Sequence, residues 1–143
     1  MVRGSATGSE REAVFAIETL SGEHVGYTGL YGIDPFNGTC GSGSMIAKEH
    51  WGQGLGTDAA HVRAHFAFRV LNLRQIYSSY LEGNERSARM QRGVGYIEWG
   101  RQPEAIWNLG RYVDHIHTVL TRENWERSRT RTGEIVDLVP RIL

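Results

Sequence analysis

Three glycines stand at alternate positions directly before a run with helical periodicity, in the stretch HWGQGLGTDAA from His50 to Ala60. Glycine lets the main chain adopt angles that other residues avoid, and it leaves the amide N–H groups uncovered. At the start of a helix such groups add to the positive end of the helix dipole and form a site for phosphate. The stretch therefore predicts an anion site, and a diphosphate-bearing cofactor is its natural occupant.

Other readings of this stretch fit less well. A Walker loop needs a lysine followed by serine or threonine, and neither follows here. The segment from Gly54 to Ala59 fits the loose dinucleotide pattern G-x-G-x-x-G/A, but residues 48–51 separate it from the preceding strand, and the next acid after Asp58 is Glu82. A nicotinamide-dependent enzyme is therefore a weaker alternative, and a plain strand-to-helix turn remains open.

The length and charge of the chain limit its class. With 143 residues, the chain is long enough for one domain and too short for two ordinary ones. Lys plus Arg equals Asp plus Glu at 16 each, so no overall field attracts nucleic acid or an anionic membrane. No apolar run approaches the roughly 20 residues that cross a bilayer. One cysteine and no secretory signal indicate a reducing cytoplasm.

The pattern of apolar residues and turn signals predicts an α+β fold. We expect a mostly antiparallel sheet with the order β-β-β-α-β-α-β-β, because a single crossover connection is present. Residues 1–12 are expected to be a disordered leader, residues 13–125 the domain, and residues 126–143 a charged tail. The predicted strands and helices are 13–20, 25–34, 39–47, 54–70 (helix), 75–81, 85–92 (helix), 96–101 and 112–120.

Reactive side chains outside the glycine stretch do not predict a second chemistry. His61 and His65 share a helix face, and His115 and His117 share a strand face, but no third ligand has the spacing of a metal site. Cys40 has no visible base to activate it as a nucleophile. We therefore expect no metal, no acyl-cysteine and no nucleic-acid partner.

Four ordered blocks resemble the GNAT superfamily of N-acetyltransferases, in the RimJ/RimL-like branch that includes ribosomal-protein N-terminal acetyltransferases. The blocks are Trp51–Ala59 (WGQGLGTDA), Asn84–Tyr96 (NERSARMQRGVGY), Tyr112–Asp114 and Glu123–Trp125. The branch has similar W-G-x-G-x-G-T-x-A and N-x-x-S-x-x-apolar patterns. The similarity runs from about Ala13 to Trp125.

The resemblance implies a GNAT-like sheet whose central strands splay apart to admit acetyl-CoA. In such a fold the loop amides bind the CoA diphosphate, two residues of the third strand pair with the pantetheine arm, and a helix asparagine bonds to that arm. The residues carried over for cofactor binding are Met45, Ile46, Trp51, Gly52, Gln53, Gly54, Leu55, Gly56, Thr57 and Asn84.

The resemblance also implies direct attack of a primary amine on the thioester, without an acyl-enzyme. The acceptor would be a protein N-terminus or a small amine. Ser87 matches the position proposed in this branch to assist the CoA thiolate, whereas many other members have a tyrosine where this chain has Gln91. Glu104 lies near the position of a carboxylate that serves some relatives as the base, about two residues out of register.

The chain departs from the family pattern at its beginning. Relatives carry about one strand and two helices before the first predicted hairpin, and those helices usually wall the acceptor site. We expect a homodimer to complete that wall. The alternative is a non-catalytic CoA-binding or interaction module derived from a shortened acetyltransferase.

Overall fold

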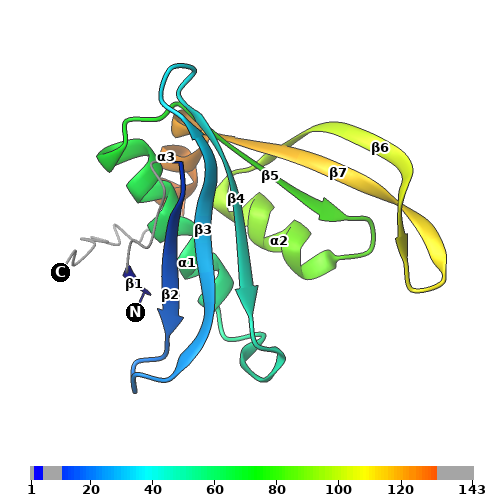
Figure 1. The fold of residues 1–143 in the computed structure, drawn as a ribbon, viewed down its shortest axis with the longest axis horizontal. Coiled ribbons are helices and arrows are strands. Elements are labelled where there is room, and N and C mark those ends of the chain that lie inside the picture. Colours follow the sequence, from blue (N-terminus) through cyan, green and yellow to red (C-terminus); the bar gives the residue numbers. More distant parts are fainter. Residues whose placement is uncertain (1, 5–10, 132–143) are drawn as a thin grey trace.

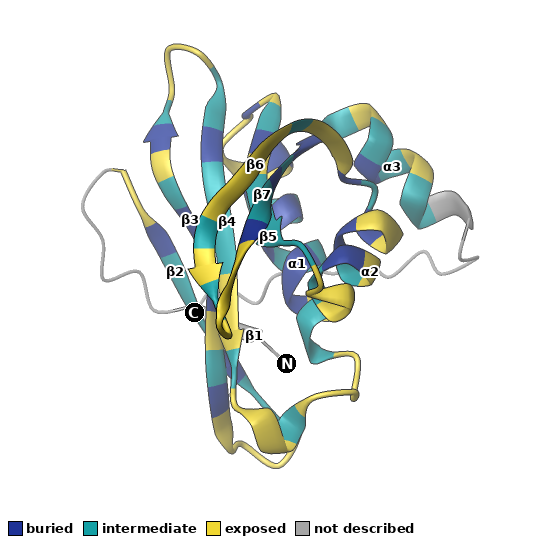
Figure 2. Ribbon diagram, turned by 90° about the vertical axis from the view of Figure 1, so that its right-hand side faces the viewer, coloured by how far each residue is buried: buried dark blue, intermediate teal, exposed yellow. Residues whose placement is uncertain are grey.

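One twisted sheet carries the described helices on one of its faces, and no described helix covers the other face (Figure 1, Figure 2). The computed structural model describes residues 2–4 and 11–131. None of the described helices is long and apolar enough to cross a membrane. The elements are β1 Val2–Gly4, β2 Ala13–Glu18, β3 His24–Asp34, β4 Thr39–Ile46, η1 Lys48–His50, α1 Leu55–His65, η2 Phe66–Val70, β5 Gln75–Leu81, α2 Glu85–Val94, β6 Ile97–Asn108, β7 Arg111–Thr121 and α3 Arg122–Arg131.

The sheet has the strand order β1-β2-β3-β4-β5-β7-β6. Every neighbouring pair is antiparallel except β4 and β5, which are parallel and are joined through α1. The predicted α+β class with a mostly antiparallel sheet is thus confirmed. Short turns join the antiparallel neighbours β2–β3, β3–β4 and β6–β7, the crossover through α1 makes the parallel pair, and β7 lies between β5 and β6.

The two central strands separate soon after they meet. β4 and β5 pair only over Thr39–Gly41 and Gln75–Tyr77. A last link crosses the opening, where the Ser42 hydroxyl donates to the Tyr77 carbonyl at 3.2 Å. Beyond it the strands diverge toward α2 (Figure 1). The predicted splayed pair is confirmed, and the free edge of β4 has main-chain groups that no strand satisfies.

The core lies between the sheet and the helices. Small residues on α1 and η2 let this helical segment approach the sheet closely, since Ala59, Ala60, Ala64 and Ala67 are all fully buried. Large apolar side chains fill the remaining space: Leu30, Phe68, Ile76, Leu120 and Trp125. The tight packing fixes the direction of α1, and so also the position of the loop at its N-terminus.

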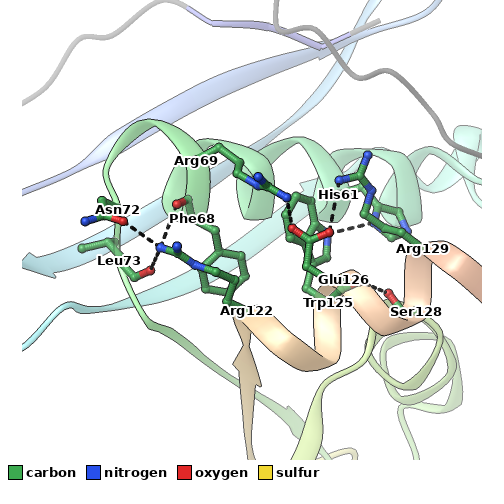
Figure 3. Close-up of polar contacts among 10 residues, drawn as sticks. All are labelled: His61, Phe68, Arg69, Asn72, Leu73, Arg122, Trp125, Glu126, Ser128 and Arg129. Atoms are coloured by element: carbon green, nitrogen blue, oxygen red, sulfur yellow. Dashed lines mark hydrogen bonds and ion pairs between the residues drawn. The ribbon is translucent and has the colours of Figure 1, made fainter.

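The closing helix α3 docks on the C-terminal end of the α1–η2 segment (Figure 3). The Trp125 side chain is fully buried, and its indole N–H donates to His61 Nδ1 at 3.2 Å. Arg122 donates to the carbonyls of Phe68 and Leu73, each at 2.9 Å. The bond to Phe68 satisfies a carbonyl of the last helical turn, and the bond to Leu73 holds the loop that follows η2.

Three stretches differ from the predicted elements. Val2–Gly4 pairs with β2, although residues 1–12 are predicted to lack structure. β6 runs to Asn108 instead of ending at Arg101. Pro103 hides this strand from a sequence pattern, yet an edge strand with a bulge tolerates proline. The domain boundary predicted after Trp125 falls inside α3, and residues 1, 5–10 and 132–143 lie outside the described residues.

Candidate active site

A cleft of about 570 Å³ lies where the free edge of β4, the glycine loop and the first turns of α2 meet. Its walls come from segments far apart in the sequence, which the splay of β4 and β5 and the crossover through α1 bring together. The lining residues are Ser44, Met45, Ile46, His50, Trp51, Gly52, Gly54, Leu55, Gly56, Thr57, Asn84, Arg86, Ser87, Arg89 and Met90.

The glycine loop keeps its amide groups free at the edge of this cleft. Gly52 and Gly54 have φ of +78° and +80°, a region that other residues enter only with strain. Gly54 is the N-cap of α1, and no side chain caps this helix start. Within the described part of the chain, no acceptor is bound by the main-chain N–H groups from Gly52 to Thr57, and the first helical bond runs from Asp58 to Gly54. The loop thus presents several unpaired donors together.

The charge of the cleft suits an anion. Its lining includes His50, Arg86 and Arg89 and contains neither aspartate nor glutamate. The positive end of the α1 dipole points to the same place. The Arg86 guanidinium lies over the Trp51 ring, 3.2 Å from its centroid, and this contact holds the cation at the loop. The geometry and the charge therefore both favour a phosphate group.

The free edge of β4 forms a second wall. Met45 pairs with Tyr27 of β3 on one side, while the other edge of the strand faces the cleft without a strand partner. The Ile46 carbonyl accepts the Trp51 indole N–H at 2.9 Å, so one of its two lone pairs is occupied. An extended chain could pair with the remaining groups of this edge as an added strand would.

The first turn of α2 forms the third wall. Asn84 caps this helix, and its Oδ1 accepts the Ser87 amide at 3.2 Å. The Ser87 hydroxyl accepts a bond from Gln91 Nε2 at 3.3 Å. Gln91 is buried and is itself held by the Thr118 hydroxyl, which donates to Gln91 Oε1 at 2.6 Å. Gln91 Nε2 also lies 3.3 Å from the Ser78 hydroxyl and from the Ser79 carbonyl. The Ser87 hydroxyl donates to no acceptor among the described residues, so its own proton is available to a group in the cleft.

The structure brings together ten of the predicted site residues and leaves two outside. Those that line the cleft are Met45, Ile46, Trp51, Gly52, Gly54, Leu55, Gly56, Thr57, Asn84 and Ser87. Gln53 belongs to the loop, but it does not line the cleft. Glu104 is exposed and lies within β6, where its amide donates to Asp114 Oδ1 at 2.9 Å. Because β6 continues past Arg101, Glu104 lies inside a strand and not in a loop before the last strand. Its carboxylate does not line the cleft.

The other reactive side chains, a cysteine and two histidines, do not form a second candidate site among the described residues. Burial raises the pKa of Cys40 to about 12, which keeps this thiol protonated near neutral pH. His61 and His65 are on α1 beside Trp125, away from the lining of the cleft. Within residues 2–4 and 11–131 no group of three or more His, Cys, Asp or Glu side chains could hold a metal ion.

Sequence reasoning missed several lining residues. Arg86 and Arg89 follow the cap Asn84 at positions that face one side of a helix, a signal that could have been used. Ser44 also lines the cleft, and its hydroxyl lies 2.5 Å from Arg63 Nη1. No sequence signal separates the buried cation Arg63 from an ordinary helix-surface arginine.

Comparison with family models matches residues 3–97 to the family described as acetyltransferase (GNAT) domain. The match covers the cleft: the strand β4, the glycine loop and the Asn84–Ser87 turn all lie within it.

Curated relatives include acetyltransferases for two kinds of amine. A putative ribosomal N-acetyltransferase of Bacillus subtilis, YdaF, is 29% identical over 105 residues, which are 73% of this chain and 57% of that protein. Spermidine N(1)-acetyltransferase of Escherichia coli K12 is 25% identical over 125 residues, 87% of this chain and 67% of that protein. The uS5-alanine N-acetyltransferase of the same strain is 26% identical over 90 residues, 63% of this chain and 46% of that protein. The chain thus spans between 46% and 67% of the length of these relatives.

Solved structures share the fold. The crystal structure of spermidine N-acetyltransferase from Vibrio cholerae in complex with CoA and spermine has a TM-score of 0.76 and 23% identity, covering 82% of this chain and 69% of that chain. The family model spans more than half of the sequence and includes β4, the glycine loop and the Asn84–Ser87 turn. The chain therefore belongs to the GNAT acetyltransferase family.

Proposed function

We propose that the protein binds acetyl-CoA and transfers its acetyl group to a primary amine. The observation that supports this most strongly is the row of unpaired amides from Gly52 to Thr57, at the edge of a cleft lined by cations and free of carboxylates. A diphosphate would satisfy these donors with charge-assisted hydrogen bonds, which are about twice as strong as neutral ones. The cleft volume of about 570 Å³ lies in the usual range for cofactor sites.

Each wall of the cleft fits one part of acetyl-CoA, from the diphosphate along the pantetheine arm to the thioester. The loop would hold the diphosphate, and Arg86 and Arg89 would lie beside the phosphates as further cations. The pantetheine arm would follow the free edge of β4 past Ile46 and Met45, with the Asn84 amide within the same cleft. Acetyl-CoA brings an activated thioester to the gap between β4 and β5.

Ser87 is our candidate to assist the departing thiolate. Its hydroxyl lines the cleft and accepts from Gln91, so its proton can be donated to sulfur. The CoA thiol resembles cysteine, with a pKa of about 8.5, and a thiolate leaves more readily when a donor contacts it. Glu104 remains an untested prediction as base, without support from its place in β6.

The acceptor class is proposed from the names of the relatives, which include acetyltransferases of ribosomal proteins and of spermidine. We propose an amine of one of these two kinds, entering from the face of the sheet that has no helical layer (Figure 2). Exposed aromatic side chains lie on that face, where Tyr77 and Trp99 are in edge-to-face contact with centroids 6.3 Å apart. Aromatic faces attract cationic groups such as ammonium.

We propose that the functional unit is a homodimer. The strand β6 is at the edge of the sheet and exposes apolar side chains, among them Ile97, Trp99 and Trp107. Such an edge is a surface that a second copy could cover. One solved spermidine N-acetyltransferase from Vibrio cholerae is a dodecamer. Light scattering at high protein concentration tests this, and a purely monomeric protein would contradict it.

Thiol release from acetyl-CoA, measured with a panel of amines, tests the proposed activity. The panel contains spermidine and short peptides that begin with alanine or serine. Turnover with any amine supports the enzyme, and the best amine names the acceptor class. Tight CoA binding without turnover on any member would favour the non-catalytic module instead.

A substitution at Ser87 tests its role. Ser87→Ala should lower kcat about 10-fold to 100-fold with little change in CoA affinity, because a proton donor acts on the chemical step. Ser21→Ala, in the exposed β2–β3 turn, is the matched control and should leave kcat unchanged. An unaltered kcat for Ser87→Ala would exclude the hydroxyl from the reaction.

A further inference from the structure

Arg63 on α1 is a buried cation with no carboxylate partner among the described residues. Its side chain is 1% exposed, and its Nε has no hydrogen-bond partner in the described part of the chain. Its two Nη atoms donate to three hydroxyls instead: Thr28 at 3.0 Å, Ser44 at 2.5 Å and Tyr96 at 3.4 Å. Hydroxyl dipoles offset only part of the free-energy cost of burying a charge. An anion close to Arg63 would offset the rest of this cost.

The positive charge of Arg63 acts on groups around it. Burial raises the pKa of Cys40 on β4 and that of Tyr31 on β3, and the Arg63 charge opposes the rise at both positions. A charge that is buried is screened far less than one in water. At Tyr31 the nearby Glu12 carboxylate acts against Arg63 and outweighs it, whereas at Cys40, on the strand β4, Arg63 is the charge that acts.

One of the Arg63 partners belongs to the cleft. Ser44 lines it, next to Met45 and Ile46 along the free edge of β4. A chain that starts at the glycine loop and follows β4 inward passes Ile46, then Met45, and reaches Ser44 next. Ser87 lines the same cleft from α2. The inner end of the cleft thus has two hydroxyls, each accepting from a buried donor.

The two arginines of the cleft differ from Arg63 in their contact with water. Arg86 and Arg89 lie on α2 and are exposed, and His50, the last residue of η1, lies 3.5 Å from the Glu23 carboxylate. On the side of Arg63, the titratable neighbours are Tyr31, Cys40 and Tyr96, and the Glu12 carboxylate acts on Tyr31. Water screens the exposed cations, so the field at the inner end comes mainly from Arg63.

We propose that Arg63, acting through the Ser44 hydroxyl, stabilises the negative charge that forms on the sulfur of CoA when the thioester is cleaved. This inference rests on the proposed function. The amine nitrogen forms a bond to the carbonyl carbon, the C–S bond breaks, and its electron pair leaves on sulfur. The sulfur receives a proton from Ser87, the proton that the amine loses restores the Ser87 hydroxyl, and Arg63 keeps all its protons. Arg63 thus acts through Ser44 as a positioning residue. The thiolate that forms during the reaction is the anion that its buried charge lacks.

The pKa of the CoA thiol bound to the protein tests this without any acetyl transfer. It is measured as the ultraviolet absorbance of the thiolate during a pH titration of the protein saturated with CoA. Cys40 is the only cysteine, and with a pKa of about 12 it stays protonated through the titration. We expect the bound thiol to titrate at least about 1 pH unit below free CoA, as expected next to a cation.

Variants of Arg63 separate its charge from its shape. Arg63→Met should raise the pKa of the bound thiol by about 1 or more, and Arg63→Lys should keep most of the lowering. Arg111→Met, on the distant β6–β7 hairpin, is the control and should change nothing. With acetyl-CoA and an amine, Arg63→Met should lower kcat about 10-fold at unchanged KM for acetyl-CoA. If Arg63→Met does not fold, Ser44→Ala takes its place and should raise the same pKa by a smaller amount.

The outcomes are distinct. Equal pKa values of the bound thiol in the native protein and in the Arg63→Met variant, with both saturated by CoA, would overturn the inference and leave the proposed function intact. The same holds for Ser44→Ala if it is the variant used. Failure of the native protein to bind CoA at all would overturn the proposed function, and this inference with it.

Discussion

The two ends of the α1–η2 segment differ in whether their main-chain groups have hydrogen-bond partners. At its C-terminal end, Arg122 of α3 donates to the carbonyls of Phe68 and Leu73, and Trp125 packs beneath it (Figure 3). At its N-terminal end, the amides from Gly52 to Thr57 have no acceptor in the described part of the chain. Because buried or clustered main-chain N–H groups usually have partners, we expect the unpaired end to bind a ligand.

Loss of Trp125 should give the largest effect, and it should be confined to stability. Trp125→Ala removes a fully buried indole from between Phe68 and His61, so the free energy of unfolding should fall by about 3 to 5 kcal/mol. Urea denaturation measures this change. Below the unfolding transition, the affinity for CoA should stay within about 3-fold of the native value, since the glycine loop is far along α1. A large loss of affinity in the folded variant would mean that the two ends are coupled.

A side chain in the glycine loop should have the reverse effect. Gly54→Val places a branched side chain at φ +80°, which shifts the loop and its amides. The affinity for CoA should fall about 100-fold, the equivalent of roughly two charge-assisted hydrogen bonds. Calorimetric titration measures it. Gly93→Val, at a helical glycine of α2 with open space around it, is the matched control and should bind CoA normally. Normal binding by Gly54→Val would remove the phosphate role of the loop.

Removal of the Arg122 bonds should have a moderate effect on stability. Arg122→Gln shortens the side chain and leaves the Phe68 and Leu73 carbonyls without this donor, at a cost of about 1 to 3 kcal/mol. Thermal unfolding of both proteins gives the difference. Unchanged stability would show that water satisfies this helix end as well as Arg122 does.

The smallest effect concerns pH. Burial, followed by the Arg129 charge, lowers the pKa of His61 below its ordinary value of 6.5, and the neutral ring accepts the Trp125 indole N–H. The unfolded chain therefore binds the proton more tightly than the folded one. The His61 contribution is fully present above about pH 6.5 and is lost as the pH falls toward the lower pKa of the folded protein. His61→Gln keeps an acceptor that does not titrate, so the fall in stability between about pH 7 and pH 5 should be shallower. Equal pH profiles would contradict this account.

The sequence predicts the open end of α1 better than the closed end. Glycine at Gly52 and Gly54 has one physical reason, the positive φ, and that reason can be read from the residue type. The helix α3 gives no such signal, because Trp125 stands alone in a strongly charged run and its burial depends on a distant surface of α1. The second half of β6 is also not predicted, because Pro103 is typical of a strand end. The Leu109-Gly110 turn, with φ of 49° and 84°, connects this part of β6 to β7 as a tight hairpin.

The candidate site shows the same limit. Asn84 and Ser87 are predicted from the family resemblance, and the structure places them in one turn at the start of α2, as a cap and the residue three positions later. Glu104 cannot, because a bulge and an unpredicted extension of β6 decide where it lies. Arg63 has the residue type of a solvent-exposed helix position and becomes a buried cation only through its tertiary contacts.

Amide resonances of the loop glycines test the central claim most directly. In protein labelled with nitrogen-15 at glycine, the resonances of Gly52, Gly54 and Gly56 can be followed as CoA is added. We expect these three to shift strongly as their N–H groups bond to the diphosphate, while Gly22 and Gly110 in the distant turns stay in place. Saturable binding of CoA that leaves the three loop glycines unmoved would contradict the account.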